Sequence, residues 1–202
     1  WQRLRQFQRL LGPRLDDRDA LQSISQEFRW SARDDGSAWR WLGGLFLSAA
    51  ERSDRDVRTF GPDAGLIGAP SGLAEDSRLD LDQRTAALYG QLRWKPVEAV
   101  RLSAGLRYER QEQEAEGRTR RTLGGAPAGP DNPFRADLDT GEWLPELRAA
   151  WDWSEKASVY ASVARGFRAG GFNNGAAGAD ATYEPEFAWS YELGIRARAF
   201  ER

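Results

Sequence analysis

The sequence contains neither cysteine nor histidine among its 202 residues. Without cysteine there is no disulfide framework and no thiolate chemistry. Without histidine the chain lacks the commonest transition-metal ligand and the usual general base. Lysine is also scarce, since almost all basic residues are arginine and lysine occurs only at positions 95 and 156. We therefore expect no catalytic centre, no resident cofactor and no metal site.

Long hydrophobic runs are missing as well. The mean hydropathy is −0.69 and 30% of the residues are charged. No window approaches the roughly 18 apolar residues that a membrane helix needs, which excludes a helical membrane protein. Strands that cross a membrane are not excluded, because alternation hides half of their residues from a hydropathy window. The net charge of −2 gives no reason to expect a nucleic-acid partner.

Strict alternation of apolar and polar residues is what the chain does contain, most clearly over residues 187–199. Side chains on a strand have a period of two, so this segment has one apolar and one charged face. The apolar face holds Trp189, Tyr191, Leu193, Ile195, Ala197 and Ala199, and the other face holds Ser190, Glu192, Gly194, Arg196 and Arg198. In a chain this polar, such a strand indicates lipid on one side and water on the other.

The same pattern recurs in about eight segments of suitable length to cross a bilayer when tilted. These are residues 1–10, 22–32, 38–50, 83–95, 98–110, 143–153, 157–167 and 187–200. In the first of them, Leu4, Phe7 and Leu11 fit helical spacing better than strand spacing. The sequence therefore predicts an all-β chain, an antiparallel up-and-down transmembrane β-barrel segment made of about eight strands of a larger barrel.

The connections between these segments alternate between short and long. Short turns are expected at 33–37, 95–97 and 154–156, and long polar loops at 51–82, 111–142 and 168–186. Outer-membrane barrels have this rhythm, with short periplasmic turns and long outer loops. Of the nine tryptophans, six lie near the short turns and predict an aromatic girdle at the periplasmic rim, while Trp143 and Trp189 are expected at the outer rim. The six are Trp30, Trp39, Trp41, Trp94, Trp151 and Trp153.

Three segments resemble the TonB-dependent receptors of the outer membrane. Residues 159–173 are similar to the pattern YxSxxxGFxxGGFN of that family, and residues 183–196 contain the later pattern PExxxxYExG. Residues 25–46 resemble the SQExR…WxxGxF hairpin of the same receptors. The resemblance covers most of the chain and is densest over residues 143–196.

This resemblance implies a 22-stranded barrel with an N-terminal plug, which imports scarce ligands with energy supplied through TonB. Ferric siderophores are the commonest ligand, so we expect one here, with an iron chelate as cargo; haem, cobalamin and saccharides remain alternatives. The partners implied are outer-membrane lipid, TonB and the ligand. The sequence starts at Trp1 without a signal-like stretch. We therefore expect residues 1–202 to be a partial barrel that lacks the plug and the final strands.

Candidate ligand-binding residues lie where the glycine-rich stretch Gly166–Gly171 enters the third long loop. We expect Arg168, Asn173 and Asn174 at the mouth of the barrel, where arginine and amide donors could meet an anionic ferric chelate. Ordinary solvated loop residues would look the same. Two other functions stay open, namely an outer-membrane porin or adhesin without energy coupling and a soluble β-sandwich binding module.

Overall fold

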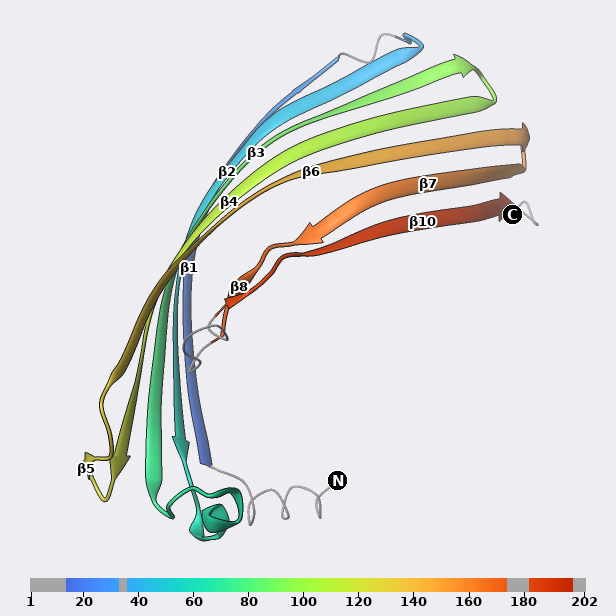
Figure 1. Cartoon of the computed structure of the whole chain (residues 1–202). Helices are drawn as coiled ribbons and strands as arrows, with labels where there is room; N and C mark the ends of the chain where they lie inside the picture. Colours follow the sequence, from blue (N-terminus) through green and yellow to red (C-terminus); the bar gives the residue numbers. More distant parts are fainter. Residues whose placement is uncertain (1–13, 33–35, 174–181, 198–202) are drawn as a thin grey trace.

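The structure is a computed structural model, and it describes residues 14–32, 36–173 and 182–197. Seven long strands form one antiparallel sheet in the order β1-β2-β3-β4-β6-β7-β10. Long strands that follow one another in the chain are therefore also neighbours in the sheet. The sheet curves like part of a barrel wall (Figure 1). The strands are β1 Arg14–Ser31, β2 Trp39–Thr59, β3 Leu73–Val97, β4 Val100–Leu123, β6 Asn132–Ser154, β7 Ala157–Arg168 and β10 Glu186–Ala197.

Three short elements complete the fold. The 3-10 helix η1, Pro62–Ile67, lies between β2 and β3, and β5, Ala126–Pro127, pairs with the end of β4. The strands β8, Gly171–Phe172, and β9, Thr182–Tyr183, form a separate two-stranded sheet. In the described part of the chain, no helix is long and apolar enough to cross a membrane.

The expected strands are largely confirmed, and the expected long loops are largely wrong. The segments predicted from residue 22 onward match long strands to within two residues over the described part, whereas residues 1–10 and 198–200 lie outside the described residues. However, β2 continues to Thr59, β3 begins at Leu73, β4 continues to Leu123 and β6 begins at Asn132. Much of 51–82 and 111–142 is therefore strand. Each strand was expected to end where its apolar alternation stops. The backbone hydrogen bonds between neighbouring strands continue beyond that point, where most side chains are polar.

Each long strand has two halves, which we call the turn-proximal half and the loop-proximal half. In the turn-proximal half, residues at paired positions carry Leu, Ala and Trp on one face, which we call the outer face. Its members include Leu45, Leu88, Leu92, Leu102, Leu106, Leu147, Leu193 and Ile195. Six of these eight residues are exposed, and Leu45 and Leu102 are half-buried. The opposite face, which we call the inner face, carries Arg40, Arg101, Arg107 and Arg196, as the alternation predicts.

Aromatic residues mark both limits of the turn-proximal half. The six tryptophans expected near the short turns lie there, and Trp39 stacks on Trp94 with ring centroids 4.8 Å apart. At the other limit Tyr108 pairs with Trp143, with ring centroids 4.8 Å apart. Trp143 is at the middle of β6 and not at its end, because β6 runs on past the apolar region. From Val100 to Tyr108, a strand rising about 3.4 Å per residue and tilted about 40° crosses roughly 21 Å.

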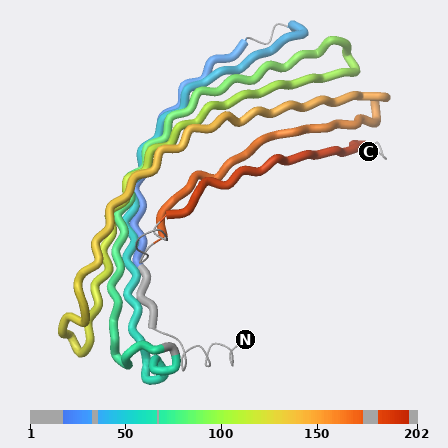
Figure 2. Tube along the Cα trace, viewed as in Figure 1, coloured from blue at the N-terminus to red at the C-terminus, as the bar shows by residue number. Residues whose placement is uncertain are grey.

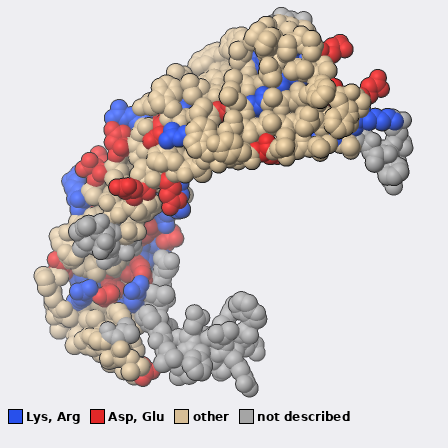
Figure 3. Space-filling model, turned by 45° about the vertical axis from the view of Figure 1, so that its right-hand side comes forward, with Lys and Arg blue, Asp and Glu red and all other residues tan. Residues whose placement is uncertain are grey.

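The loop-proximal half is largely polar on its outer face and mixed on its inner face, where Leu79 and Ala115 are buried. Figure 3 shows few charged residues over the turn-proximal half and closely mixed basic and acidic residues over the rest of the sheet. Beyond Ala164, β7 no longer pairs with β6 but stays paired with β10. This hairpin bends away from β6 toward the concave side of the sheet (Figure 2). Its bend follows the glycine-rich stretch that was expected to mark a strand entering an outer loop.

Candidate functional site

The inner face of the turn-proximal half carries a polar cluster centred on Tyr89 of β3. The Tyr89 hydroxyl donates to Glu27 Oε1 at 2.6 Å and accepts from Arg29 Nε at 3.1 Å. Arg29 also forms an ion pair with Glu27, at 2.6 Å. Both partners belong to β1, so Tyr89 reaches across the whole width of β2.

Gly44 explains how Tyr89 crosses β2. Gly44 is the cross-strand partner of Tyr89 and is buried. A Cβ atom built at Gly44 would collide with the ring of Tyr89, and it would stand 2.8 Å from the carbonyl oxygen of Phe28. Glycine therefore leaves the space in which an aromatic ring covers the neighbouring strand. Tyr160 covers Gly194 in the same way, and its hydroxyl donates to Glu192 Oε1 at 2.8 Å.

A second inner-face group lies beside this cluster on β4. Arg107 Nε donates to Glu109 Oε2 at 2.7 Å. Its guanidinium carbon lies 5.6 Å from the ring centroid of Phe46 and 5.8 Å from that of Tyr89. Arginine, carboxylate and aromatic side chains thus line the inner face in the turn-proximal half. Such a wall suits water or a polar partner on the inside of a barrel.

Higher on the inner face, the β7–β10 hairpin packs against β4. The Gln113 amide donates from Nε2 to the carbonyl oxygen of Gly170, at 2.9 Å. Gln113 is only 4% exposed and Ala115, two residues along the same face, is fully buried. A Cβ atom at Gly170 would lie 2.5 Å from the carbonyl oxygen of Tyr183. Gly170 and Gly171 therefore allow the backbone around Tyr183 to approach closely beside the inner face of the loop-proximal half.

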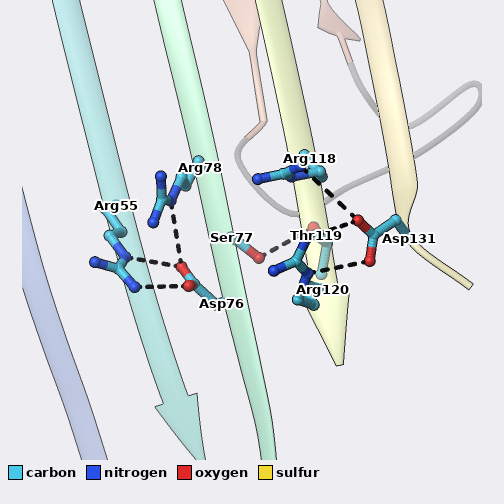
Figure 4. A network of polar contacts seen from close by, with 8 residues as sticks. All are labelled: Arg55, Asp76, Ser77, Arg78, Arg118, Thr119, Arg120 and Asp131. Atoms are coloured by element: carbon cyan, nitrogen blue, oxygen red, sulfur yellow. Dashed lines mark hydrogen bonds and ion pairs between the residues drawn. The ribbon is translucent and has the colours of Figure 1, made fainter. Parts of the chain in front are cut away.

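The loop-proximal hairpins are held together by an ion-pair network (Figure 4). Arg55 binds Asp76 through two hydrogen bonds, of 2.9 and 2.7 Å, and Arg120 binds Asp131 through two, of 3.3 and 3.1 Å. These guanidinium donors hold the pKa of Asp76 and the pKa of Asp131 below the usual range of aspartate. Ser77 and Thr119 lie between the two pairs with their hydroxyl oxygens 3.1 Å apart.

Within the described ranges, no group of three or more acidic side chains is arranged to hold a metal ion. Arg52 binds Asp54 at 2.8 Å and Arg58 lies 3.8 Å from Asp56, so both carboxylates face arginine.

The arrangement of two aromatic rims, an apolar outer face and a polar inner face agrees with the comparison to known families. The family described as "TonB dependent receptor-like, beta-barrel" matches residues 3–201. The chain belongs to the TonB-dependent receptor family. This is a family of receptors and not of enzymes.

Among solved structures, a TonB-dependent receptor has the same fold over most of the chain. The chain is similar to the ferric yersiniabactin uptake receptor FyuA from Yersinia pestis, with a TM-score of 0.73 and 20% sequence identity. The match covers 92% of this chain and 27% of the FyuA chain. The fold therefore corresponds to about a quarter of a TonB-dependent receptor.

The residues expected at the mouth of this receptor barrel are only partly brought together. Arg168 ends β7 opposite Glu186 of β10, and Asn173 directly follows β8; both are exposed. Asn174 lies outside the described residues. Among the described residues Arg168 has no ion-pair partner.

Sequence reasoning missed two groups that the TonB-dependent receptor fold brings together. One is the cluster of Tyr89 with Glu27 and Arg29, and the other is the contact of Gln113 with Gly170. The Gly43–Gly44 pair inside an otherwise regular strand was the available signal for the first, since glycine within a strand often marks close approach of a neighbour. No local signal exists for the second, because its two residues are 57 positions apart.

Proposed function

We propose that this chain forms part of the barrel of an outer-membrane receptor that imports a scarce ligand with energy supplied through TonB. The two faces of the turn-proximal half carry this proposal. An apolar outer face roughly 21 Å tall, close to the apolar band of about 25 Å in outer-membrane barrels and bounded by aromatic rims, suits lipid, and an arginine-rich inner face suits a polar interior. The plug and the segment that contacts TonB would belong to regions outside residues 1–202.

We further propose that the cargo is a ferric siderophore. The name of FyuA, a ferric yersiniabactin uptake receptor, supports an iron chelate as the class of ligand. The exposed guanidinium of Arg168 at the end of β7 suits an anionic chelate, and the amides of Asn173 and Asn174 are expected to add hydrogen-bond donors. The iron would travel as cargo and would not be a resident cofactor.

Uptake of radiolabelled iron by iron-limited cells tests the transport proposal. Cells that lack the gene should lose uptake of one ferric siderophore, and the complete gene should restore it. Restored uptake should disappear when TonB is deleted. Uptake that persists without TonB would instead indicate a porin, and no uptake defect with any siderophore would contradict the proposed cargo.

Substitution at the barrel mouth tests the binding residues. Arg168→Ala should weaken binding of the ferric siderophore about tenfold, because a hydrogen bond to a charged group contributes about 1.5–3 kcal/mol. Arg135→Ala is the matched control, since Arg135 is exposed on the outer face and pairs with Glu116 at 3.1 Å. Equal affinity of both variants for the chelate would contradict the role of Arg168.

A further inference from the structure

The loop-proximal half of β6 has one edge that no described strand covers. β6 pairs with β4 over residues 132–151, but it pairs with β7 only over residues 146–154. The β7–β10 hairpin leaves β6 at this point and bends toward the concave side of the sheet (Figure 1). Over residues 132–145, the second edge of β6 therefore has no strand partner in the described part of the chain.

Trp143 shows which backbone groups point to this edge. Arg165 of β7 donates from Nη1 to the carbonyl oxygen of Trp143 at 2.8 Å, so this carbonyl points to the β7 side. Along a strand, the N–H and C=O groups of every second residue point to the same side. The register of β6 against β4 is uninterrupted over residues 132–151, so the alternation is kept. We call the residues whose N–H and C=O groups point to the uncovered side the open edge, namely Arg135, Asp137, Asp139 and Gly141.

Two prolines limit the open edge at its two ends. Pro133 and Pro145 belong to the same set of alternate residues, and proline has no backbone N–H. Proline is tolerated in a strand where the missing N–H would not face a partner, which agrees with the unbroken pairing of β6 with β4 at both positions. Between the prolines, donors and acceptors alternate as on any strand edge. Such an edge is a template for one more strand.

Apolar side chains follow the open edge on the inner face. Phe134, Ala136 and Leu138 lie on that face opposite β4 and are half-buried, whereas the residues of the open edge are exposed on the outer face. Side chains at paired positions of an added strand would lie about 4.5–5.5 Å from them. Apolar residues at every second position of that strand would therefore be buried on the inner face.

An acidic row on the outer face ends at the open edge. Its members occupy paired positions on four neighbouring strands and are exposed: Glu51 of β2, Asp82 of β3, Glu114 of β4 and Asp137 of β6. Arg135, in the next row, binds Glu116 at 3.1 Å and reaches Glu114 only at 3.9 Å. Asp137 has no ion-pair partner among the described residues. Because like charges placed opposite each other are destabilising, a basic side chain next to Asp137 on an added strand would stabilise the row.

We propose that the open edge of β6 binds an extended peptide strand of another protein by strand addition. The peptide runs antiparallel to β6, as β7 does, and continues the β6–β7 pairing beyond the point where β7 leaves it. It carries apolar residues toward the inner face and basic residues toward the outer face. In this mode of recognition, backbone hydrogen bonds supply affinity and alternate side chains supply specificity. The inference goes beyond the transport function and does not depend on the cargo.

A synthetic peptide in which lysine and valine alternate over about seven residues tests the open edge, with the complete protein in detergent. In an antiparallel pair, residues in register lie on the same face, so the lysines would carry the N–H groups that face β6. One comparison peptide is N-methylated on its lysines and a second on its valines, so that composition and charge stay alike. A third peptide has glutamate in place of lysine. Isothermal titration calorimetry measures the affinities, and amide hydrogen exchange locates the bound peptide.

Asp137→Pro and Asp137→Ala form a matched pair of variants. Both remove the carboxylate, but only proline also removes the N–H of the open edge. Its position is equivalent to those of Pro133 and Pro145, so the pairing with β4 should be kept. Heat-dependent gel mobility verifies that each variant is folded. The lysine-methylated peptide tests the same hydrogen bonds on the unmodified protein, should the proline variant fail to fold.

The unmethylated and valine-methylated peptides should bind alike, and at least about tenfold more tightly than the lysine-methylated and glutamate peptides. Asp137→Pro should bind the unmethylated peptide about tenfold more weakly than Asp137→Ala. The bound peptide should slow amide exchange at residues 135, 137, 139 and 141. Equal binding of the lysine-methylated and unmethylated peptides, equal binding by the two variants, or slowed exchange only elsewhere would each overturn the inference. Dimerisation of the receptor through this edge in place of peptide binding would also overturn it.

Discussion

The two halves of each long strand share one backbone ladder but differ in the side chains of the outer face. Leu88 of β3 and Tyr108 of β4 are paired in the turn-proximal half. Ten residues away along the same two strands, in the loop-proximal half, Arg78 is paired with Arg118. Hydrogen bonding alone therefore does not set where an apolar face is needed. The medium around the outer face sets it, because lipid requires apolar side chains and water allows ion pairs.

The comparison predicts that a charge on the outer face is costly in one half and harmless in the other. Leu106→Arg between the aromatic rims should destabilise the complete barrel by about 2–4 kcal/mol, since arginine must enter the hydrocarbon. Glu114→Arg on the same face of the same strand should change stability by no more than about 0.5 kcal/mol. Reversible unfolding in urea with lipid vesicles measures both values. Equal tolerance at the two positions would show that the outer face of the turn-proximal half does not meet lipid.

The second largest loss of stability is expected on the inner face, where Tyr89 covers Gly44. Gly44→Ala should destabilise the protein by about 1–3 kcal/mol, because the new methyl group meets both the Tyr89 ring and the carbonyl oxygen of Phe28. Gly43→Ala is the control, since its added Cβ would lie at an ordinary 3.6 Å from the carbonyl oxygen of Tyr89. Unfolding in urea again gives the measurement. Similar losses in the two variants would mean that glycine is needed for backbone freedom and not for the ring.

Periodicity predicted the turn-proximal half well because lipid and water impose opposite demands on its two faces. Leu102, Leu106 and Leu193 fall on the face expected for them, and Arg101 and Arg107 on the other. The loop-proximal half gives no such signal, since Arg, Asp and Glu occupy both faces and resemble a solvated loop. The pairing of Arg78 with Arg118 was invisible for a different reason. Arg78 and Arg118 are 40 residues apart, and only the register of β3 against β4 brings them together.

The same limit applies to the candidate binding residues. The glycine-rich pattern of 166–171 located the bend where Arg168 ends β7, because glycine has a local structural meaning. It could not locate the contact of Gln113 with Gly170, which depends on how far the β7–β10 hairpin leans over β4. Side chains that meet through tertiary packing therefore required the structure.

A smaller loss of stability is expected where Gly170, next to β8, meets the inner face of β4. Gln113→Ala removes the buried donor to the carbonyl oxygen of Gly170 and should cost about 1 kcal/mol. The loss should appear as faster hydrogen exchange over residues 168–173 and 182–186, with the turn-proximal half unchanged. Gln111→Ala on the same face is the control. If both variants exchange alike, then packing, and not this hydrogen bond, holds the hairpin in place.

The smallest expected effect is a dependence on pH confined to the loop-proximal half. Arg55 lowers the pKa of Asp76, and Arg120 lowers the pKa of Asp131, so both carboxylates bind protons less readily in the folded state than in the unfolded chain. Their contribution to stability is therefore present above the unfolded pKa of about 3.9 and is lost as pH falls through the lower folded values. Hydrogen exchange near pH 3 should speed up first in residues 52–59 and 73–80. Asp76→Asn should remove much of this acid sensitivity around Arg55, because the amide does not titrate. Acid sensitivity that is equal in both halves of β3 would show that these ion pairs do not hold the loop-proximal hairpins together.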